Sequence, residues 1–578
     1  MSNSQSTPAI EKAGFRWSAL DSLLVWIVSI YGGIAALALL IAPRFLLPAE
    51  DAVILFQFSR NLAHTAAITY VPGGIHAEGA TDFGWMVLLA LGIKIGVSPF
   101  WLVALLNVVS LVLIGVLLIK IAGCKVNALA LLFIAGSLAL MPQIFAAVLG
   151  FSTLSFACLL VLLCFYFLQQ NDIATPAAAL ALCLFRPDGV VFAIPLLIAA
   201  LIIYPHRLRR LGLDTAIFVL PGVLYFLWRW HYFGELLPLP FLVKSAVHRV
   251  AHILVLNSVH RGQLLCFFSA ILLWFILRDR MADPRNRAVL LCLVILPNLF
   301  YFAMRLEQNI GHRFSIYLPV GTAILLAMNW QQTRSQHYFL LRVGLAAWII
   351  FICRIWIPDA HEIWPHQLDN RTAIAREMAT LPHGIIVLTE AGVLPYYSQW
   401  PSNDAWGLNT ARFSRHLIQP SDVAQINPDV MLVFTRGTVA GGTDACTPQA
   451  DWETPYAARS WQGMTRNLIA AAPADRYNLW SLPYGNLSYR AHLHLESWQG
   501  GQECWLIRRD SPLRQNVEDI LVRHHGLTDQ QFRTLVPLPE TSSTSLDTQP
   551  VHQRPVRARS LLQKVKARVS KLWHLLDE

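Results

Sequence analysis

Two adjacent carboxylates, Glu50 and Asp51, stand directly after the first long apolar segment of this 578-residue chain. They lie in a polar stretch that is too short to form a domain and too charged to lie in lipid. Carboxylates held at a membrane surface usually serve a functional site. Because helix termination does not require two carboxylates at this point, we interpret Glu50 and Asp51 as candidate catalytic residues.

Further charged residues fall on the same side of the predicted membrane domain. Arg60, Glu78 and Asp82 follow in the same polar region, and Arg186 and Asp188 interrupt two short apolar segments. Charges at a broken helix are costly in a membrane protein unless they line a cavity. Two structural alternatives stay open: Arg60 and Asp188 could form only an ion pair, and Glu78 and Asp82 could be helix-capping residues.

A cationic group comes later in the chain and comprises Lys244, His248, Arg249, His312 and Arg313. Arg and Lys bind phosphate well because charge-assisted hydrogen bonds are roughly twice as strong as neutral ones. The group therefore suits a lipid whose polar end is a phosphate. The alternative is that Lys244 or Arg249 only extends to lipid head groups, and that the histidines serve packing.

The composition predicts a polytopic α-helical membrane protein, because 55% of the residues are hydrophobic and only 14% are charged. Apolar runs that can cross about 30 Å of hydrocarbon predict about eleven spans. The predicted spans are Leu23–Leu47, Pro99–Ile121, Ala128–Val148, Leu154–Leu168, Ala174–Phe185, Val190–Tyr204, Thr215–Trp228, Leu264–Leu277, Ala288–Met304, Ile316–Met328 and Tyr338–Ile357. The segment Asp82–Gly96 reaches Lys94 and Pro99 too soon, so it is predicted to lie in the interface.

Charge placement predicts the topology of these spans. Lys and Arg accumulate in short cytoplasmic loops, and in this scheme the basic clusters fall on one side, which places the N-terminus in the cytoplasm. An odd number of spans then places everything after Ile357 outside. The first apolar run is too long for a cleaved signal peptide, so it is expected to remain as an anchor.

The chain divides into four parts by composition. These are a cytoplasmic N-terminus at 1–22, a membrane domain at 23–357 with an outer loop at 48–98, an extracytoplasmic α/β domain at 358–539, and a tail at 540–578. Strand-like runs at 384–388, 430–434 and 504–507 support the α/β assignment. The composition of the tail predicts a linker followed by a basic amphipathic helix. Two alternatives stay open for this helix: it binds anionic lipid, or it is a solvated helix or a partly disordered tail.

Two of the nine cysteines, Cys446 and Cys504, belong to the predicted outer domain. An oxidising exterior would allow them to pair, and the alternative is two unrelated buried thiols. No spacing of cysteine or histidine indicates a metal site of the Cys-x-x-Cys type.

Four segments of the loop at 48–98 resemble the first outer loop of the GT-C glycosyltransferases, and the branch with the cell-wall arabinofuranosyltransferases most of all. They are Glu50-Asp51-Ala52-Val53-Ile54, Arg60-Asn61-Leu62-Ala63, Tyr70-Val71-Pro72-Gly73-Gly74 and Glu78-Gly79-Ala80-Thr81. Segments at 186–189, 233–238, 313–319, 390–397 and 404–408 resemble the same branch in the same order. The branch has Asp where this chain has Glu50.

The resemblance implies a multi-pass enzyme of the bacterial inner (plasma) membrane, with its active site and C-terminal domain on the periplasmic side. The implied donor is a polyprenyl-phosphate sugar such as arabinofuranose, and the implied acceptor is a cell-envelope glycan, lipid or protein; no nucleic acid is expected. In such enzymes a carboxylate takes the proton of the acceptor hydroxyl, while cations stabilise the departing phosphate. Whether a divalent cation assists is left open.

Carried onto this chain, the resemblance makes Asp51 the base, with Glu50 as the close alternative. Arg60 and Asp188 would orient the site, and Lys244, Arg249 and Arg313 would hold the donor phosphate. The other residues predicted to bind the donor phosphate or the substrate are Arg186, His248, His312, Glu78 and Asp82. Two other classes stay open. A flippase or transporter of a lipid-linked envelope precursor would also need a charged cavity, although no internal repeat typical of transporters is evident. A non-catalytic assembly factor is the third reading.

Overall fold

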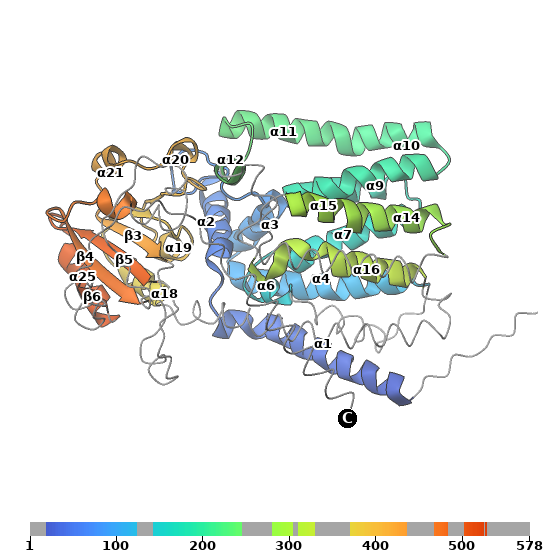
Figure 1. Cartoon of the computed structure of the whole chain (residues 1–578), viewed down its shortest axis with the longest axis horizontal. Helices are drawn as coiled ribbons and strands as arrows, with labels where there is room; N and C mark the ends of the chain where they lie inside the picture. The colour runs from blue at the N-terminus through green and yellow to red at the C-terminus, as the bar shows by residue number, and fades with distance from the viewer. Residues whose placement is uncertain are drawn as a thin grey trace, which may run out of the picture. The chain divides into compact units, whose positions relative to one another are not determined.

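The computed structural model describes residues 19–123, 143–245, 280–303, 310–329, 370–435, 467–483, 502–524 and 526–528. Its first part is helical (Figure 1). The helices are α1 (Ala19–Phe45), α2 (Glu50–Thr65), α3 (Phe83–Lys94), α4 (Pro99–Ile121), α6 (Ile144–Val148), α7 (Thr153–Leu168), α8 (Ala174–Phe185), α9 (Val190–Ile203), α10 (Arg207–Asp214), α11 (Leu220–Phe233), α12 (Leu239–Ser245), α14 (Pro284–Leu290), α15 (Leu296–Ala303) and α16 (Tyr317–Met328). Short helical turns, η2 (Thr215–Val219) and η5 (Leu291–Ile295), join α10 to α11 and α14 to α15.

Eight of the predicted spans coincide with helices in the described residues, namely α1, α4, α7, α8, α9, α11, the α14–α15 pair and α16. Among these residues, three helices are long and apolar enough to cross a membrane: Pro99–Ile121, Arg207–Phe233 and Pro284–Phe302. A fourth counts if α1 and α2, which meet at a bend of 71°, form one span. The predicted spans at 264–277 and 338–357 lie outside the described residues, as does 128–142.

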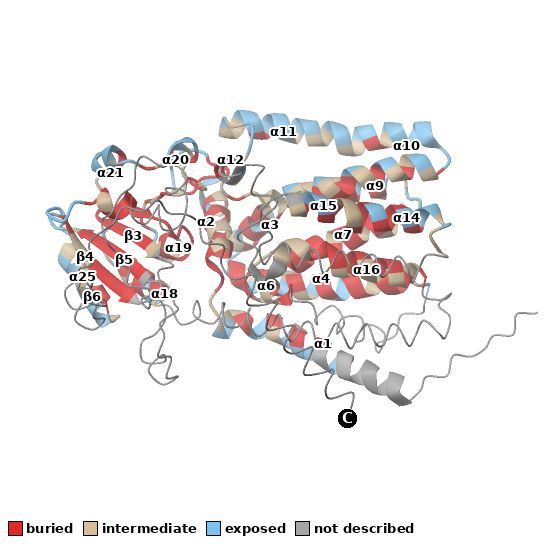
Figure 2. Cartoon of the chain, viewed as in Figure 1, coloured by how far each residue is buried: buried red, intermediate tan, exposed pale blue. Residues whose placement is uncertain are grey.

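The helices pack around α7, whose residues Leu160, Val161 and Phe167 have no exposed surface. Its cysteines, Cys158 and Cys164, are buried and free, as expected of thiols that act as small hydrophobes. Figure 2 shows buried residues concentrated on the central helices, whereas α10 and α11 are mostly exposed. Exposed apolar surface on a helix of this length is what a lipid-facing helix requires.

The second part contains one six-stranded mixed sheet of strand order β2-β1-β3-β5-β4-β6. The strands are β1 (Ile386–Leu388), β2 (Ser402–Asp404), β3 (Val430–Thr435), β4 (Tyr477–Pro483), β5 (Gln502–Arg508) and β6 (Leu527–Thr528). β1 pairs in parallel with β2 and β3, and the remaining pairs are antiparallel. The accompanying helices are α18 (Arg371–Met378), α19 (Val393–Ser398), α20 (Ala411–Arg415), α21 (Pro420–Ile426) and α25 (Arg514–Arg523).

The sheet is buried on both faces. Alternate residues of β3 enter two different apolar clusters: Val430 and Leu432 belong to one, and Met431 and Val433 to the other. This alternation follows from the two-residue period of a strand. The first cluster also includes Phe58 of α2, so the region after the first apolar helix packs into the core of the sheet domain.

A turn at 404–409 makes a second contact with the loop at 48–98. The buried carboxylate of Asp404 accepts hydrogen bonds from the backbone N–H groups of Trp406 and Asn409, both at 2.9 Å. Gly79 of the loop lies so close that a Cβ there would be 2.1 Å from Oδ1 of Asn409. Only glycine fits at this position, and the contact holds the loop against the sheet domain.

Candidate active site

Glu50 and Asp51 occupy the first turn of α2. Carboxylates are favourable there because the N-terminus of a helix carries partial positive charge. Successive residues of an α-helix point about 100° apart, so the two side chains face different surroundings. The α2 helix therefore separates the two carboxylates that stand side by side in the sequence.

Asp51 pairs with Arg313 of the short helix η6 (Ile310–Ser315), and 28% of its side chain is exposed. Nη2 of Arg313 donates to Oδ2 of Asp51 at 3.0 Å. The guanidinium lies 4.1 Å from the ring centroid of Phe151. Its other terminal nitrogen, Nη1, is buried and has no hydrogen-bond partner within the described residues. Arg313 thus retains one donor for a further anion.

Arg186 and Asp188 bond to each other where α8 ends and the 3-10 turn η1 (Pro187–Gly189) begins. Nε of Arg186 donates to Oδ1 of Asp188 at 3.1 Å, and Nη2 donates to Oδ2 at 2.6 Å. The hydroxyl of Tyr301 on α15 donates to the same carboxylate. Arg186 is 4% exposed and lies over the ring of Phe156 at 4.3 Å. The two hydrogen bonds fix the orientation of the Arg186 guanidinium relative to the Asp188 carboxylate.

Asp82 completes the charged cluster, which we call the Arg313 cluster and define as Asp51, Asp82, Arg186, Asp188 and Arg313. Asp82 precedes α3 but forms no capping hydrogen bond, so the helix-capping alternative is wrong for its side chain. Burial raises the pKa of Asp82, while Arg186 and Arg313 act in the opposite direction. These contacts bring all five residues, each predicted from the sequence as a site residue, to one place.

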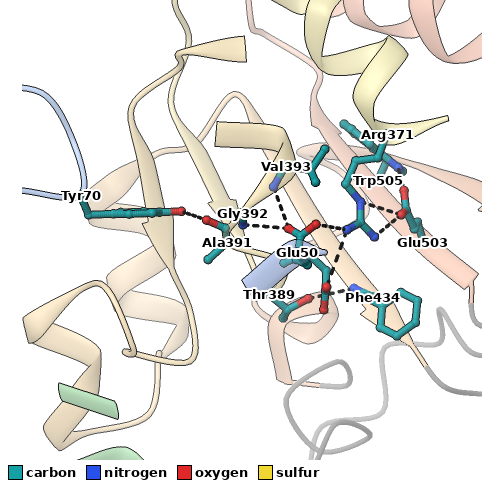
Figure 3. A network of polar contacts seen from close by, with 11 residues as sticks. Glu50, Tyr70, Arg371, Thr389, Ala391, Gly392, Val393, Phe434, Glu503 and Trp505 are labelled. Atoms are coloured by element: carbon teal, nitrogen blue, oxygen red, sulfur yellow. Dashed lines mark hydrogen bonds and ion pairs between the residues drawn. The ribbon is translucent and has the colours of Figure 1, made fainter. Parts of the chain in front are cut away.

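Glu50 does not join this cluster. Its carboxylate accepts hydrogen bonds from Nη1 of Arg371 at 2.9 Å and from the backbone N–H groups of Gly392 at 2.7 Å and Val393 at 3.0 Å. Figure 3 shows these contacts together with the ion pair between Arg371 and Glu503. Both oxygens of Glu50 are therefore occupied, whereas the carboxylate of Asp51 is 28% exposed and has Arg313 as its partner.

Two other predicted site residues also have structural partners. Arg60 donates to the backbone carbonyl of Tyr396 at 2.6 Å and to the side chain of Gln57 at 2.5 Å, so the alternative of an ion pair with Asp188 is wrong. Glu78 accepts a hydrogen bond from Nε of Arg229 on α11 at 2.7 Å. Both residues hold the segment at 48–98 in place through these contacts.

Several predictions fall where side chains are not described. Lys244 lies in α12 and His312 in η6, each with its backbone alone described, and His248 and Arg249 lie outside the described residues. Cys504 is disulfide-bonded, while Cys446 lies outside the described residues. Within the part of the chain that the structure describes, no group of three or more His, Cys, Asp or Glu could hold a metal ion.

Sequence reasoning missed Arg371, Glu503 and Tyr301. A signal for Arg371 does exist, because the buried positions of α18 include residues 371, 374, 375 and 378, which is the spacing of an apolar helix face. An arginine on that face requires a buried carboxylate as its partner. The partner itself, Glu50, is 321 residues away and cannot be identified from spacing.

Comparison with known proteins finds similarity to one family and to several solved structures. Residues 361–481 match a family described as a domain of unknown function, DUF8728. No curated protein matches the chain. The chain is similar to a crystal structure of ArnT from Cupriavidus metallidurans bound to undecaprenyl phosphate, with 15% identity and a TM-score of 0.47 over 71% of this chain and 92% of that chain. The apo structure of ArnT has the same identity and TM-score, over 72% and 93%.

Proposed function

We propose that this chain is a membrane glycosyltransferase that transfers a sugar from a polyprenyl-phosphate donor to a hydroxyl of a cell-envelope acceptor. The observation that carries the proposal is the ion pair between Asp51 and Arg313. It brings together a partly exposed carboxylate and a guanidinium with an unused donor. A base and an anion-binding cation in contact are what glycosyl transfer from a phosphate requires.

In the proposed reaction, the acceptor hydroxyl oxygen attacks the anomeric carbon of the donor sugar. Asp51 takes the hydroxyl proton as the new glycosidic bond forms. The bond between the anomeric carbon and the phosphate oxygen breaks, and the lipid phosphate leaves with the electron pair. Arg313 stabilises the negative charge that develops on this oxygen. The products are the glycosylated acceptor and the polyprenyl phosphate.

The pairing of Arg313 also suggests an order of binding. Nη2 of Arg313 donates to Oδ2 of Asp51 at 3.0 Å, and Nη1, which has no hydrogen-bond partner among the described residues, can donate to a phosphate oxygen. A phosphate bound to this guanidinium competes with Asp51 for its positive charge. A weaker ion pair leaves the carboxylate of Asp51 available to accept the hydroxyl proton. The donor is therefore expected to bind before the acceptor is activated.

Arg186 and Asp188 have a supporting role in this proposal. The charge of Arg186 is balanced by Asp188, and both side chains are held by two hydrogen bonds. We assign them to fixing the geometry of the Arg313 cluster and not to a second phosphate-binding site. Lys244, His248, Arg249 and His312 remain predicted contacts of the donor phosphate. Arabinofuranose, the sugar of the branch that the motifs resemble, is the first donor sugar to test.

The test is sugar transfer by the purified protein in lipid vesicles. Radiolabelled polyprenyl-phosphate sugars are offered one at a time, with envelope glycans, lipids and proteins as acceptors. Asp51→Asn is expected to lower transfer by about 10² to 10⁴-fold, the contribution of a positioned base, with unchanged thermal unfolding. The control is Arg415→Gln, which removes an exposed ion pair with Glu235 and is expected to keep full activity.

Three outcomes decide the proposal. Transfer from one donor that is lost in Asp51→Asn supports both the reaction and its base. Full transfer by Asp51→Asn overturns the role of Asp51. Absence of transfer from every donor, combined with movement of the labelled lipid across the bilayer, overturns the transferase and favours the flippase.

A further inference from the structure

A buried network joins the start of α2 to the sheet domain (Figure 3). Arg371 of α18 is at its centre and has no exposed surface. Its Nη1 donates to Glu50 at 2.9 Å, and its Nε donates to Oε1 of Glu503 on β5 at 2.9 Å. The second oxygen of Glu503 accepts from Nε1 of Trp505 at 3.0 Å. Each member thus fixes the direction of the next.

The other oxygen of Glu50 binds the N-terminus of α19. It accepts from the backbone N–H groups of Gly392 and Val393, which carry the partial positive charge of a helix start. Gly392 lies so close that a Cβ there would be 2.1 Å from the backbone oxygen of Glu50. The first residue of α2 is therefore held both through its side chain and through its backbone.

Two more contacts attach the outer loop region to the same segment of the sheet domain. The hydroxyl of Tyr70 donates to the backbone carbonyl of Ala391 at 2.6 Å, and Arg60 donates to that of Tyr396. These contacts begin 20 and 10 residues after Glu50 in the sequence, so they cannot substitute for it at the first turn of α2. The position of that turn depends on Glu50.

We infer that Arg371 is a positioning residue for Asp51, acting through Glu50, so that the sheet domain sets the geometry of the candidate base. The inference rests on the proposed function for the role of Asp51. The contacts form a continuous chain from Trp505 through Glu503, Arg371 and Glu50 to the residue that bonds to Arg313.

Burial and charge explain why this series of contacts fixes the positions of its residues more than it stabilises the fold. A buried ion pair gives little net stability compared with apolar packing, because removing two charges from water is costly. Its directional hydrogen bonds do specify one arrangement of the groups. Displacing a catalytic group by about 1 Å can lower a rate about 100-fold. A network that fixes the residue next to the base therefore has a large effect on turnover.

The first experiment measures the position of residue 51 without any sugar transfer. Asp51→Cys is labelled with a water-soluble maleimide in lipid, and the labelling rate is compared in three backgrounds: Glu503→Gln, Gly392→Ala and Arg415→Gln. The protein with Asp51 intact measures labelling of the native cysteines. We expect the rate to change about tenfold with Glu503→Gln and Gly392→Ala, and to be unchanged with Arg415→Gln.

The second experiment measures turnover in the same backgrounds with Asp51 intact. A positioning effect lowers kcat about 100-fold while the KM for the donor lipid changes little, because the donor contacts on Arg313 remain. Glu503→Asp keeps the charge and is expected to retain more activity than Glu503→Gln. A loss of folded protein, without a change in kcat of the folded fraction, would indicate a structural role only.

The outcomes separate this inference from the proposed function. If the thiol at position 51 reacts at the same rate in folded Glu503→Gln, the sheet domain does not set the position of this residue through Glu503 and Arg371, and the inference is overturned, whatever the transfer assay shows. If the labelling rate responds but no donor sugar is transferred, the proposed function fails and the structural link stands. Glu503→Gln is isosteric, so it decides the question when Gly392→Ala does not fold.

Discussion

Two arginines bind the two adjacent carboxylates of α2, and they differ in what else they bind. Arg371 has no exposed surface, and its Nε, Nη1 and Nη2 all contact carboxylates. Arg313 is 13% exposed and contacts Asp51 through one nitrogen, while the other has no hydrogen-bond partner in the described part of the chain. Buried polar groups are normally satisfied, so an unused donor beside a partly exposed carboxylate indicates a ligand site.

A structural network and a candidate site can therefore consist of the same residue types. They differ in whether every donor of the arginine has a hydrogen-bond partner. Both regions consist of arginines and carboxylates, and both lie next to the first turn of α2. The Arg371 network has no donor nitrogen left for a substrate anion, because Nε, Nη1 and Nη2 of Arg371 all contact carboxylates. In the Arg313 cluster, Nη1 of Arg313 has no hydrogen-bond partner among the described residues. The predictions below test whether the two regions differ in function as they do in geometry.

The largest effect on stability is expected from Arg371→Leu. Removing one partner leaves Glu50 and Glu503 buried without their cation, which costs about 3 to 5 kcal/mol in the free energy of unfolding. The control is Arg415→Leu, because Arg415 is 68% exposed and pairs with Glu235, and exposed pairs contribute about 1 kcal/mol or less. Denaturant unfolding in detergent measures both. Equal losses in the two variants would show that the Arg371 network is no more important than a surface pair.

A smaller effect, on binding rather than stability, is expected from Arg313→Gln. Loss of a charged donor should weaken binding of polyprenyl phosphate about 10- to 100-fold, the factor that corresponds to a charge-assisted hydrogen bond. Arg509→Gln serves as a control because Arg509 is an exposed arginine of the sheet domain. Binding is measured by titrating the lipid into purified protein. An unchanged affinity in Arg313→Gln would remove Arg313 from the phosphate site.

Much of the helical part could be predicted from the sequence, because runs of apolar residues of sufficient length identify helices without any knowledge of their neighbours. The strands at Ile386–Leu388 and Val430–Thr435 were predictable for the same local reason. The helix α2 was not predicted, since Glu50–Thr65 was interpreted as part of a polar loop. Its buried residues Ala52, Phe56 and Ser59 do show helical spacing.

The missing helix explains why the roles of Glu50 and Asp51 could not be separated from the sequence. In an extended loop, two adjacent carboxylates could both reach one substrate. In a helix they diverge by about 100°, and only one of them can face Arg313. The partner that occupies Glu50 is 321 residues further along the chain. Pairing over such a separation depends on tertiary structure, which residue types and local spacing do not encode.

The smallest effect is expected from Glu390→Gln, which tests how charge is balanced in the Arg371 network. Oε2 of Glu390 lies 3.7 Å from Nη1 of Arg371. Burial raises the pKa of Glu390 well above its ordinary value of 4.5; Arg371 lowers it, and the neighbouring Glu50 and Glu503 raise it further. We therefore expect the folded protein to retain the Glu390 proton to higher pH than the unfolded chain does, and glutamine is a close substitute for the protonated side chain.

The raised pKa of Glu390 determines whether the free energy of unfolding rises or falls with pH. The unfolded chain releases the Glu390 proton near pH 4.5, whereas the folded protein retains it to higher pH, so the free energy of unfolding falls as the pH rises through that window. Glu390→Gln does not titrate, and its stability relative to the natural chain should increase from pH 5 to pH 8. Glu377 is the control of opposite sign, because hydrogen bonds from Arg523 and His524 lower its pKa. Its contribution to stability is present above about pH 4.5 and is lost at lower pH, so Glu377→Gln should gain relative stability as the pH falls below about 4.5 and change little from pH 5 to pH 8. If Glu390→Gln instead loses relative stability as the pH rises, Glu390 is ionised and Arg371 holds three charged carboxylates.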